Sequence, residues 1–148
     1  MKIEIKNLKI NERLSEETLC FSATVYVDGK RAFEACNRGH GGANEYHGDY
    51  DAAAAYAATL PPYTSEVGSL PYDLDMLIGD LIEAAQLERA LKRDLKRVVF
   101  VDNGKYFLTK ADATPDMIAA VVKRYPTATI LNTMPLADAV ALCKGMGL

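Results

Sequence analysis

The chain has 148 residues, of which 49% are hydrophobic and 25% are charged, the composition of a folded globular protein rather than of a disordered one. This length can bury a core without disulfide or metal staples, so we expect a single domain over residues 1–148. The formal net charge of −3 is too small to indicate a nucleic-acid partner through bulk electrostatics.

The first quarter of the chain predicts a three-stranded antiparallel meander. Residues 2–10 and 19–27 alternate between apolar and polar side chains, as half-buried strands do. The pair Asp28-Gly29 favours a two-residue hairpin turn, because both central positions of a type I′ turn need positive φ. Residues 30–36 then return as the third strand.

The register of this hairpin contains a conflict. A two-residue turn pairs Val25 with Ala32 and places Phe33 opposite Thr24, on the face away from Val25. Either a helix covers that second face or a bulge shifts the register, and we expect partial cover by a helix. A slip in the alternation at Asn7 predicts a bend or bulge in the first strand.

Two helices are predicted in the middle of the chain. Residues 49–60 are rich in alanine, the best helix former, and Pro61-Pro62 ends that helix. Residues 63–71 are expected to form a turn-rich connector. Apolar side chains at i, i+3, i+4 spacing then predict a long helix from residue 73 to residue 97.

The last third predicts a second hairpin and further alternating elements. Asn103-Gly104 stands between the apolar runs 98–101 and 106–109, a strong hairpin signal. The elements expected after it are a helix at 116–124, a strand at 127–131 and a helix at 136–144. The expected fold is therefore α+β, with the N-terminal meander, central helices, a second hairpin and a C-terminal β-α-β-α tail.

Cysteine usage and hydropathy indicate the expected compartment. The three cysteines are widely spaced without a C-x-x-C pair, so we expect reduced thiols rather than a disulfide framework or zinc knuckle. The first six residues lack the apolar core of a secretion signal. No apolar run approaches the ~20 residues that a membrane helix needs. These features predict a cytoplasmic protein without a membrane partner, and homo-oligomerisation is left open.

Residues 36–51 carry the groups best suited to contact a ligand. They hold four of the ten glycines and both histidines. Backbone amides at Gly39, Gly41 and Gly42 would form a nest for a phosphate or carboxylate, although the dinucleotide and P-loop fingerprints are incomplete. The competing interpretation is a flexible turn that needs positive φ. The candidate binding residues are Asn37, Arg38, Gly39, His40, Gly41, Gly42, Asn44, Tyr46, His47 and Tyr50.

The same segment also contains residue types used in metal binding and catalysis. Cys36, His40, His47, Asp49 and Asp51 include the ligand types of zinc, but the spacing C-x3-H-x6-H-x-D-x-D matches no zinc framework. A nucleophile, base and orienting acid would all lie on one short loop, whereas catalytic geometry usually draws on several rigid elements. We therefore assign no metal, no cofactor and no catalytic residue, and the sequence favours a non-enzyme.

A basic stripe offers a different kind of site. Its residues are Arg89, Lys92, Arg93, Lys96 and Arg97. Spacings of three and four place much of it on one helical face, where it would bind nucleic-acid phosphates. The charges also complement the helix dipole, and no aromatic residues interleave with them for base stacking. Nucleic-acid binding through residues 89–97 is therefore the third hypothesis.

Two stretches of the chain resemble small proteins of phages and prophages, a group without an established activity. The first is residues 19–30 together with Asn-Arg-Gly-His-Gly-Gly at 37–42, and the second runs from Pro-Tyr-Asp-Leu-Asp at 71–75 to Lys-Arg-Val-Val-Phe-Val-Asp-Asn-Gly-Lys at 96–105. The resemblance implies only a setting, the bacterial cytoplasm during phage or mobile-element life, where accessory proteins often inhibit or sequester host factors.

The leading hypothesis is a non-enzymatic binding protein that inhibits a host enzyme or defence complex through the glycine-rich loop 37–50, with a host protein as partner. Tyr46 and Arg38 are its candidate anchors, since amphipathic side chains near loops often anchor interfaces. The alternative is a small-ligand protein that binds or cleaves a nucleotide with the same loop.

Overall fold

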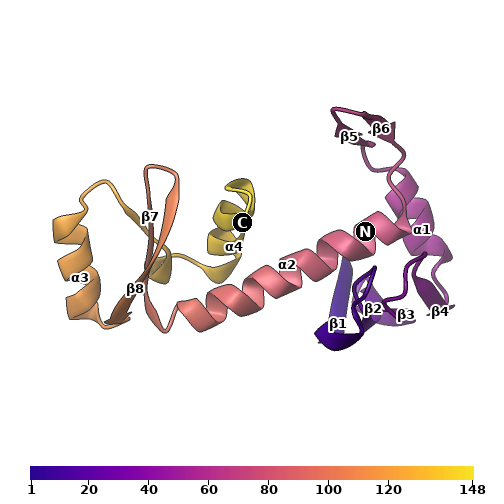
Figure 1. Cartoon of the computed structure of the whole chain (residues 1–148), viewed down its shortest axis with the longest axis horizontal. Helices are drawn as coiled ribbons and strands as arrows, with labels where there is room; N and C mark the ends of the chain where they lie inside the picture. Colours follow the sequence, from indigo (N-terminus) through magenta and orange to yellow (C-terminus); the bar gives the residue numbers. More distant parts are fainter. The chain divides into compact units, whose positions relative to one another are not determined.

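A computed structural model describes all residues, 1–148, and the chain forms two compact units, residues 1–82 and residues 83–148 (Figure 1). Its four α-helices and antiparallel sheets make it an α+β protein, as the sequence predicts. The expectation that residues 1–148 fold as a single domain stays a prediction.

The first unit contains a four-stranded antiparallel sheet rather than the expected three-stranded meander. Strands β1 (Ile3–Ile10), β2 (Phe21–Val27), β3 (Lys30–Asn37) and β4 (Glu45–Gly48) lie in the order β1-β2-β3-β4. The fourth strand falls inside the segment that the sequence assigns to a loop. Only four residues long and mostly polar, β4 lacks the apolar alternation that identifies the other strands.

A bulge, not a covering helix, resolves the register conflict of the β2–β3 hairpin. The register shifts between Val25 and Tyr26, so that Val25 pairs with Phe33 instead of Ala32. Both Val25 and Phe33 are buried on the same face, with exposed fractions of 0% and 2%. The expectation of a helix over a second apolar face was therefore wrong. The predicted irregularity at Asn7 is confirmed by a register shift and a φ of 55°.

Helices and a small hairpin complete the first unit. Helix α1 (Asp51–Ala58) begins two residues later and ends two residues earlier than expected, with Ala53 and Ala57 buried. The segment expected to be a connector forms a separate hairpin, β5 (Tyr63–Ser65) and β6 (Gly68–Leu70). A single 3₁₀ turn, η1 (Glu12–Leu14), follows β1.

Helix α2 (Leu74–Asp94) begins near the expected position and ends three residues before Arg97. Asp73 caps its first turn, because the Oδ1 atom accepts a hydrogen bond of 2.9 Å from the amide of Met76. The helix ends early because the chain turns after Asp94 into strand β7 (Arg97–Asp102). No helix is both long enough and apolar enough to cross a membrane.

The second unit has a three-stranded sheet in the order β8-β7-β9. Both outer strands are antiparallel to β7, so β8 and β9 are parallel to one another. The other elements are β8 (Lys105–Asp112), α3 (Pro115–Arg124), β9 (Thr129–Ile130), η2 (Leu131–Thr133) and α4 (Leu136–Gly145). One buried cluster of this unit consists of Leu91, Val99, Val101, Leu131, Ala139 and Cys143, and Val98, Phe100 and Ile130 are buried as well.

Candidate functional site

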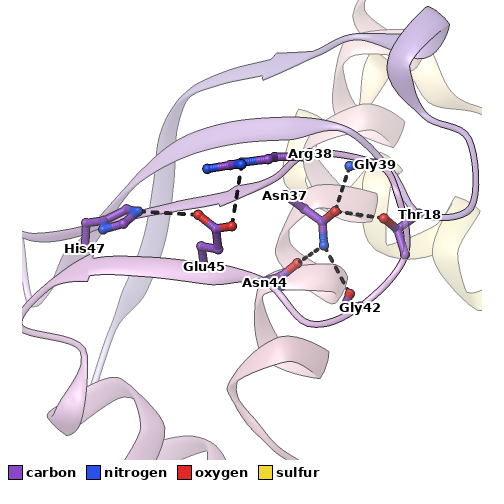
Figure 2. A network of polar contacts seen from close by, with 8 residues as sticks. All are labelled: Thr18, Asn37, Arg38, Gly39, Gly42, Asn44, Glu45 and His47. Carbon is purple, nitrogen blue, oxygen red and sulfur yellow. Dashed lines mark hydrogen bonds and ion pairs between the residues drawn. The ribbon is translucent and has the colours of Figure 1, made fainter.

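The base of the glycine-rich loop is organised by the buried side chain of Asn37 (Figure 2). Its Oδ1 atom accepts hydrogen bonds from the Thr18 hydroxyl at 2.7 Å and from the Gly39 amide at 2.9 Å. Its Nδ2 atom donates to the Gly42 carbonyl at 3.3 Å and to Asn44 Oδ1 at 3.1 Å. All four hydrogen-bonding capacities of the amide are therefore used inside the chain. Asn37, a predicted binding residue, holds the loop together.

Gly39 fixes the loop against the segment that precedes β2. Its carbonyl accepts hydrogen bonds from the amides of Glu16 and Glu17 at 2.9 and 3.0 Å. With a φ of +85°, a Cβ atom at this position would lie 2.0 Å from the carbonyl oxygen of Leu14. Only glycine fits here, because both the backbone conformation and the available space exclude a side chain.

Two of the three amides expected to form an anion nest donate hydrogen bonds within the chain. The Gly39 amide donates to Asn37, and the Gly41 amide donates to the Thr18 hydroxyl at 3.3 Å. A carboxylate oxygen of Glu17 lies 2.7 Å from where a Cβ of Gly41 would stand. An anion at this position would meet that negative charge at close range.

Asn44 and Tyr46 connect the loop to helix α2 through one carboxylate. The Tyr46 hydroxyl donates to Asp75 Oδ1, and the backbone amide of Asn44 donates to Asp75 Oδ2 at 3.2 Å. The side-chain Nδ2 atom of Asn44 donates to the Tyr46 oxygen at 3.1 Å. Burial and the hydrogen bond to Asp75 raise the pKa of Tyr46 well above its usual range. The phenol is therefore a protonated donor at neutral pH.

Aromatic rings extend from this point towards the surface. The Tyr46 ring centroid lies 5.7 Å from that of Phe33 and 5.6 Å from that of Tyr50. Phe33 is buried, whereas Tyr50 retains 39% exposure. The cluster therefore runs from the buried Phe33 to the partly exposed Tyr50.

An open groove of about 400 Å³ lies beside this cluster, and we call it the acidic tyrosine groove. Its lining residues are Tyr46, Tyr50, Ala54, Ala58, Tyr72, Asp73, Leu74 and Asp75. The Tyr72 hydroxyl donates to Asp80 Oδ2 at 2.5 Å, and burial with this bond raises the Tyr72 pKa. Asp73 is exposed and lines the groove, while its Oδ1 atom caps α2.

The charge distribution of the sequence makes this groove acidic. Residues 39–88 contain nine Asp and Glu but no Lys or Arg. The first unit carries seven Lys and Arg against thirteen Asp and Glu, whereas the second carries ten against seven. The mild net charge of the whole chain hides this asymmetry. Counting Lys, Arg, Asp and Glu separately in each part of the sequence would have revealed this acidic segment.

The remaining polar residues of the loop point outward. The side chains of Arg38, His40 and His47 are 78%, 62% and 67% exposed. Arg38 Nε lies 3.7 Å from one Glu45 oxygen and His47 Nε2 lies 3.8 Å from the other, as Figure 2 shows. His40 Nδ1 lies 3.3 Å from Glu16 Oε2. The predicted binding residues therefore fall into three groups. Asn37 and Gly39 hold the loop together, Tyr46 and Tyr50 line the groove, and Arg38, His40 and His47 are exposed.

The basic stripe is less continuous than the sequence suggests. Lys92 Nζ lies 3.1 Å from a Glu88 oxygen, and Arg93 Nε lies 3.8 Å from an Asp94 oxygen. Lys96 and Arg97 follow the end of α2 and do not share its helical face.

The chain matches no protein-family model, no curated protein and no solved structure.

Proposed function

We propose that the chain is a non-enzymatic binding protein that holds a Lys- or Arg-bearing segment of a partner protein in its acidic tyrosine groove. The observation that carries this proposal is the combination of tyrosine rings and aspartate carboxylates around one groove, in a stretch without a single Lys or Arg. Two residues predicted from the sequence, Tyr46 and Tyr50, belong to it.

The chemistry of the groove suits a cationic side chain on an apolar stem. A Lys or Arg cation is attracted to a tyrosine face within about 6 Å of the ring centroid, and charge-assisted hydrogen bonds to carboxylates strengthen the contact. Ala54, Ala58 and Leu74 supply an apolar floor on which the methylene stem would pack. The volume lies in the lower part of the range of ligand sites, roughly 300–1,000 Å³.

The state of the polar groups favours binding over catalysis. Both oxygens of Asp75 accept hydrogen bonds within the chain. Tyr46 and Tyr72 have raised pKa values and donate to carboxylates, so neither phenol is a base at neutral pH. A general base needs a pKa near the working pH and a free position towards the substrate.

The loop contributes to this function mainly by holding its shape. Asn37 and Gly39 fix residues 37–44, and strand β4 then carries Tyr46 to the groove. A preorganised surface loses less entropy on binding. The amides of Gly39 and Gly41 already donate within the chain. This supports a protein partner over the nucleotide alternative, which needs the loop amides free for phosphate.

The resemblance to phage and prophage proteins supplies the proposed setting. In the bacterial cytoplasm the partner would be a host enzyme or a component of a defence complex, and occupation of its basic segment would inhibit it. Acidic surfaces accelerate encounters with basic partners and make binding sensitive to salt.

Site-specific photocrosslinking in bacterial cells tests the proposal. A photoreactive phenylalanine analogue replaces Tyr50 at the groove, and the matched control carries it at the exposed Tyr63. We expect a protein adduct from position 50 whose cross-linked peptide contains Lys or Arg, and its yield should fall in the Asp73→Asn background. A partner peptide without basic residues, or equal adducts from both positions, would contradict the proposal.

A further inference from the structure

The β3–β4 hairpin brings three metal-binding side chains together on the face opposite Tyr46. Cys36 pairs with Glu45 across the strands, and His47 follows Glu45 by two residues, so the three side chains share one face. The thiol sulfur, a carboxylate oxygen and an imidazole nitrogen all lie within 4.8 Å of one another.

We propose that Cys36, Glu45 and His47 bind a zinc ion, at a site that is separate from the acidic tyrosine groove and independent of its function. Thiolate, imidazole and carboxylate are the three ligand types that zinc accepts in proteins. Calcium and magnesium need sites built from oxygen ligands, so the sulfur and nitrogen atoms select against them. Cys36 binds as the thiolate, and its proton passes to solvent.

The spacing of the three atoms is close to that of a tetrahedral site. Zinc bonds of about 2.0–2.3 Å place neighbouring ligand atoms roughly 3.5 Å apart. Small side-chain rotations are therefore enough to bring the ligand atoms, now up to 4.8 Å apart, to the separation that zinc needs. Glu45 and His47 are free to make them, because their side chains are 46% and 67% exposed.

The contacts that Glu45 makes without an ion are weak ones. Its two carboxylate oxygens lie 3.7 Å from Arg38 Nε and 3.8 Å from His47 Nε2, beyond good hydrogen-bonding distance (Figure 2). A divalent ion between Glu45 and His47 replaces the second contact with two coordination bonds. It also leaves the exposed Arg38 side chain able to turn into solvent.

The fourth position of the site is open. Glu34 pairs with His47 across the strands, but its carboxylate already accepts hydrogen bonds from Arg31 at 2.7 Å and from the Thr24 hydroxyl at 3.0 Å. Three protein ligands leave one position for water or for a ligand from another molecule, as in zinc sites that are not purely structural.

The sequence spacing conceals this site. The ligands follow the pattern C-x8-E-x-H, and Glu45 faces Cys36 only because β4 pairs with β3 in this register. The sequence interpretation considered Cys36, His40, His47, Asp49 and Asp51 as ligands, omitted Glu45 and assigned no metal. In the structure His40 lies next to Glu16.

Calorimetric titration of the reduced, full-length chain with zinc chloride alone tests the proposal. We expect one ion per chain, and Cys36→Ser, Glu45→Gln and His47→Ala should each weaken binding by at least about tenfold, since even groups that only hydrogen-bond a metal ligand change affinity by 10–100-fold. Cobalt added in place of zinc should give a thiolate-to-metal charge-transfer band that Cys36→Ser abolishes.

Matched controls keep the result interpretable. Cys20→Ser and His40→Ala remove the same residue types outside the cluster, and both should bind zinc like the unaltered chain. Circular dichroism of each variant establishes that it is folded. Absence of zinc binding, affinity that survives Cys36→Ser in the folded protein, or equal losses in the two controls would overturn the proposal.

Discussion

Replacement of Asn37 by alanine should destabilise the first unit more than any exposed asparagine replacement in the chain. The substitution removes four hydrogen bonds, two accepted and two donated, from a side chain that is only 7% exposed. A typical hydrogen bond contributes about 0.5–1.5 kcal/mol net, and some unpaired groups will recover a water. We therefore expect a loss of about 2–4 kcal/mol in the free energy of unfolding.

Urea denaturation followed by circular dichroism measures this loss. With a slope of about 2 kcal/mol per molar urea, the middle of the usual range for small proteins, the midpoint should fall by roughly 1–2 M. Asn11→Ala is the control, because Asn11 makes a single exposed side-chain hydrogen bond to the Leu14 amide and should cost about 1 kcal/mol or less. A midpoint for Asn37→Ala equal to that of Asn11→Ala would refute the assignment of Asn37 as the support of the loop.

Three further predictions concern the fold. Gly39→Ala should cost more than about 3 kcal/mol, because its Cβ would strike the Leu14 carbonyl, whereas Gly42→Ala, also at positive φ but in open space, should cost only about 1–2 kcal/mol in thermal unfolding. Asn132→Ala removes three hydrogen bonds of 2.7, 3.1 and 2.8 Å that join η2 to β7 and the end of α2, and it should lower the urea stability of the second unit by about 2–3 kcal/mol. Above pH ~10, stability should fall as pH rises, because phenols with raised pKa values stay protonated in the folded chain but ionise in the unfolded one. These phenols are Tyr46, Tyr72 and Tyr106.

Each of these has a result that would contradict it. Equal costs for the two glycine variants would show that the close approach at Gly39 is not maintained in solution. An Asn132→Ala transition that coincides with the unaltered one would remove the role assigned to that amide. An ultraviolet titration in which all eight tyrosines ionise together near pH 10 would contradict the raised pKa values.

The outline of the fold was predictable wherever local chemistry decides it. Asp28-Gly29 and Asn103-Gly104 form the two predicted turns, with positive φ at all four positions. Helix α3 begins at Pro115, one residue before the expected start, and the Thr114 hydroxyl caps it by accepting from the amide of Met117. These signals lie within a few residues of one another, so no tertiary information is needed to read them.

Features that depend on distant partners were missed. Strand β4 exists through pairing with β3, and the bulge at Val25 reflects the preference of Phe33 for the buried face. The loop was expected to offer its amides to a ligand, but Thr18 and Asn37 accept from two of them.

The groove could not be predicted because its halves are far apart in the sequence. Tyr46 and Tyr50 were proposed from their position beside the loop, whereas Asp73 and Asp75 come from the start of α2. Only the fold places these carboxylates beside the tyrosines. The sequence did contain one overlooked signal, the absence of Lys and Arg from residues 39–88.

The most direct test of the groove is the affinity of the chain for a peptide that covers the basic segment identified by crosslinking. Asp73→Asn removes one groove charge while keeping the helix cap, since Asn and Asp cap helices about equally well. Glu66→Gln removes an exposed charge from the turn of the β5–β6 hairpin, outside the groove, and serves as control. A charge-assisted contact of about 1–2 kcal/mol predicts a 5–30-fold weaker Kd for Asp73→Asn at low salt and an unchanged Kd for Glu66→Gln. Equal affinities for both variants and the unaltered chain would contradict the claim that this groove is the binding site.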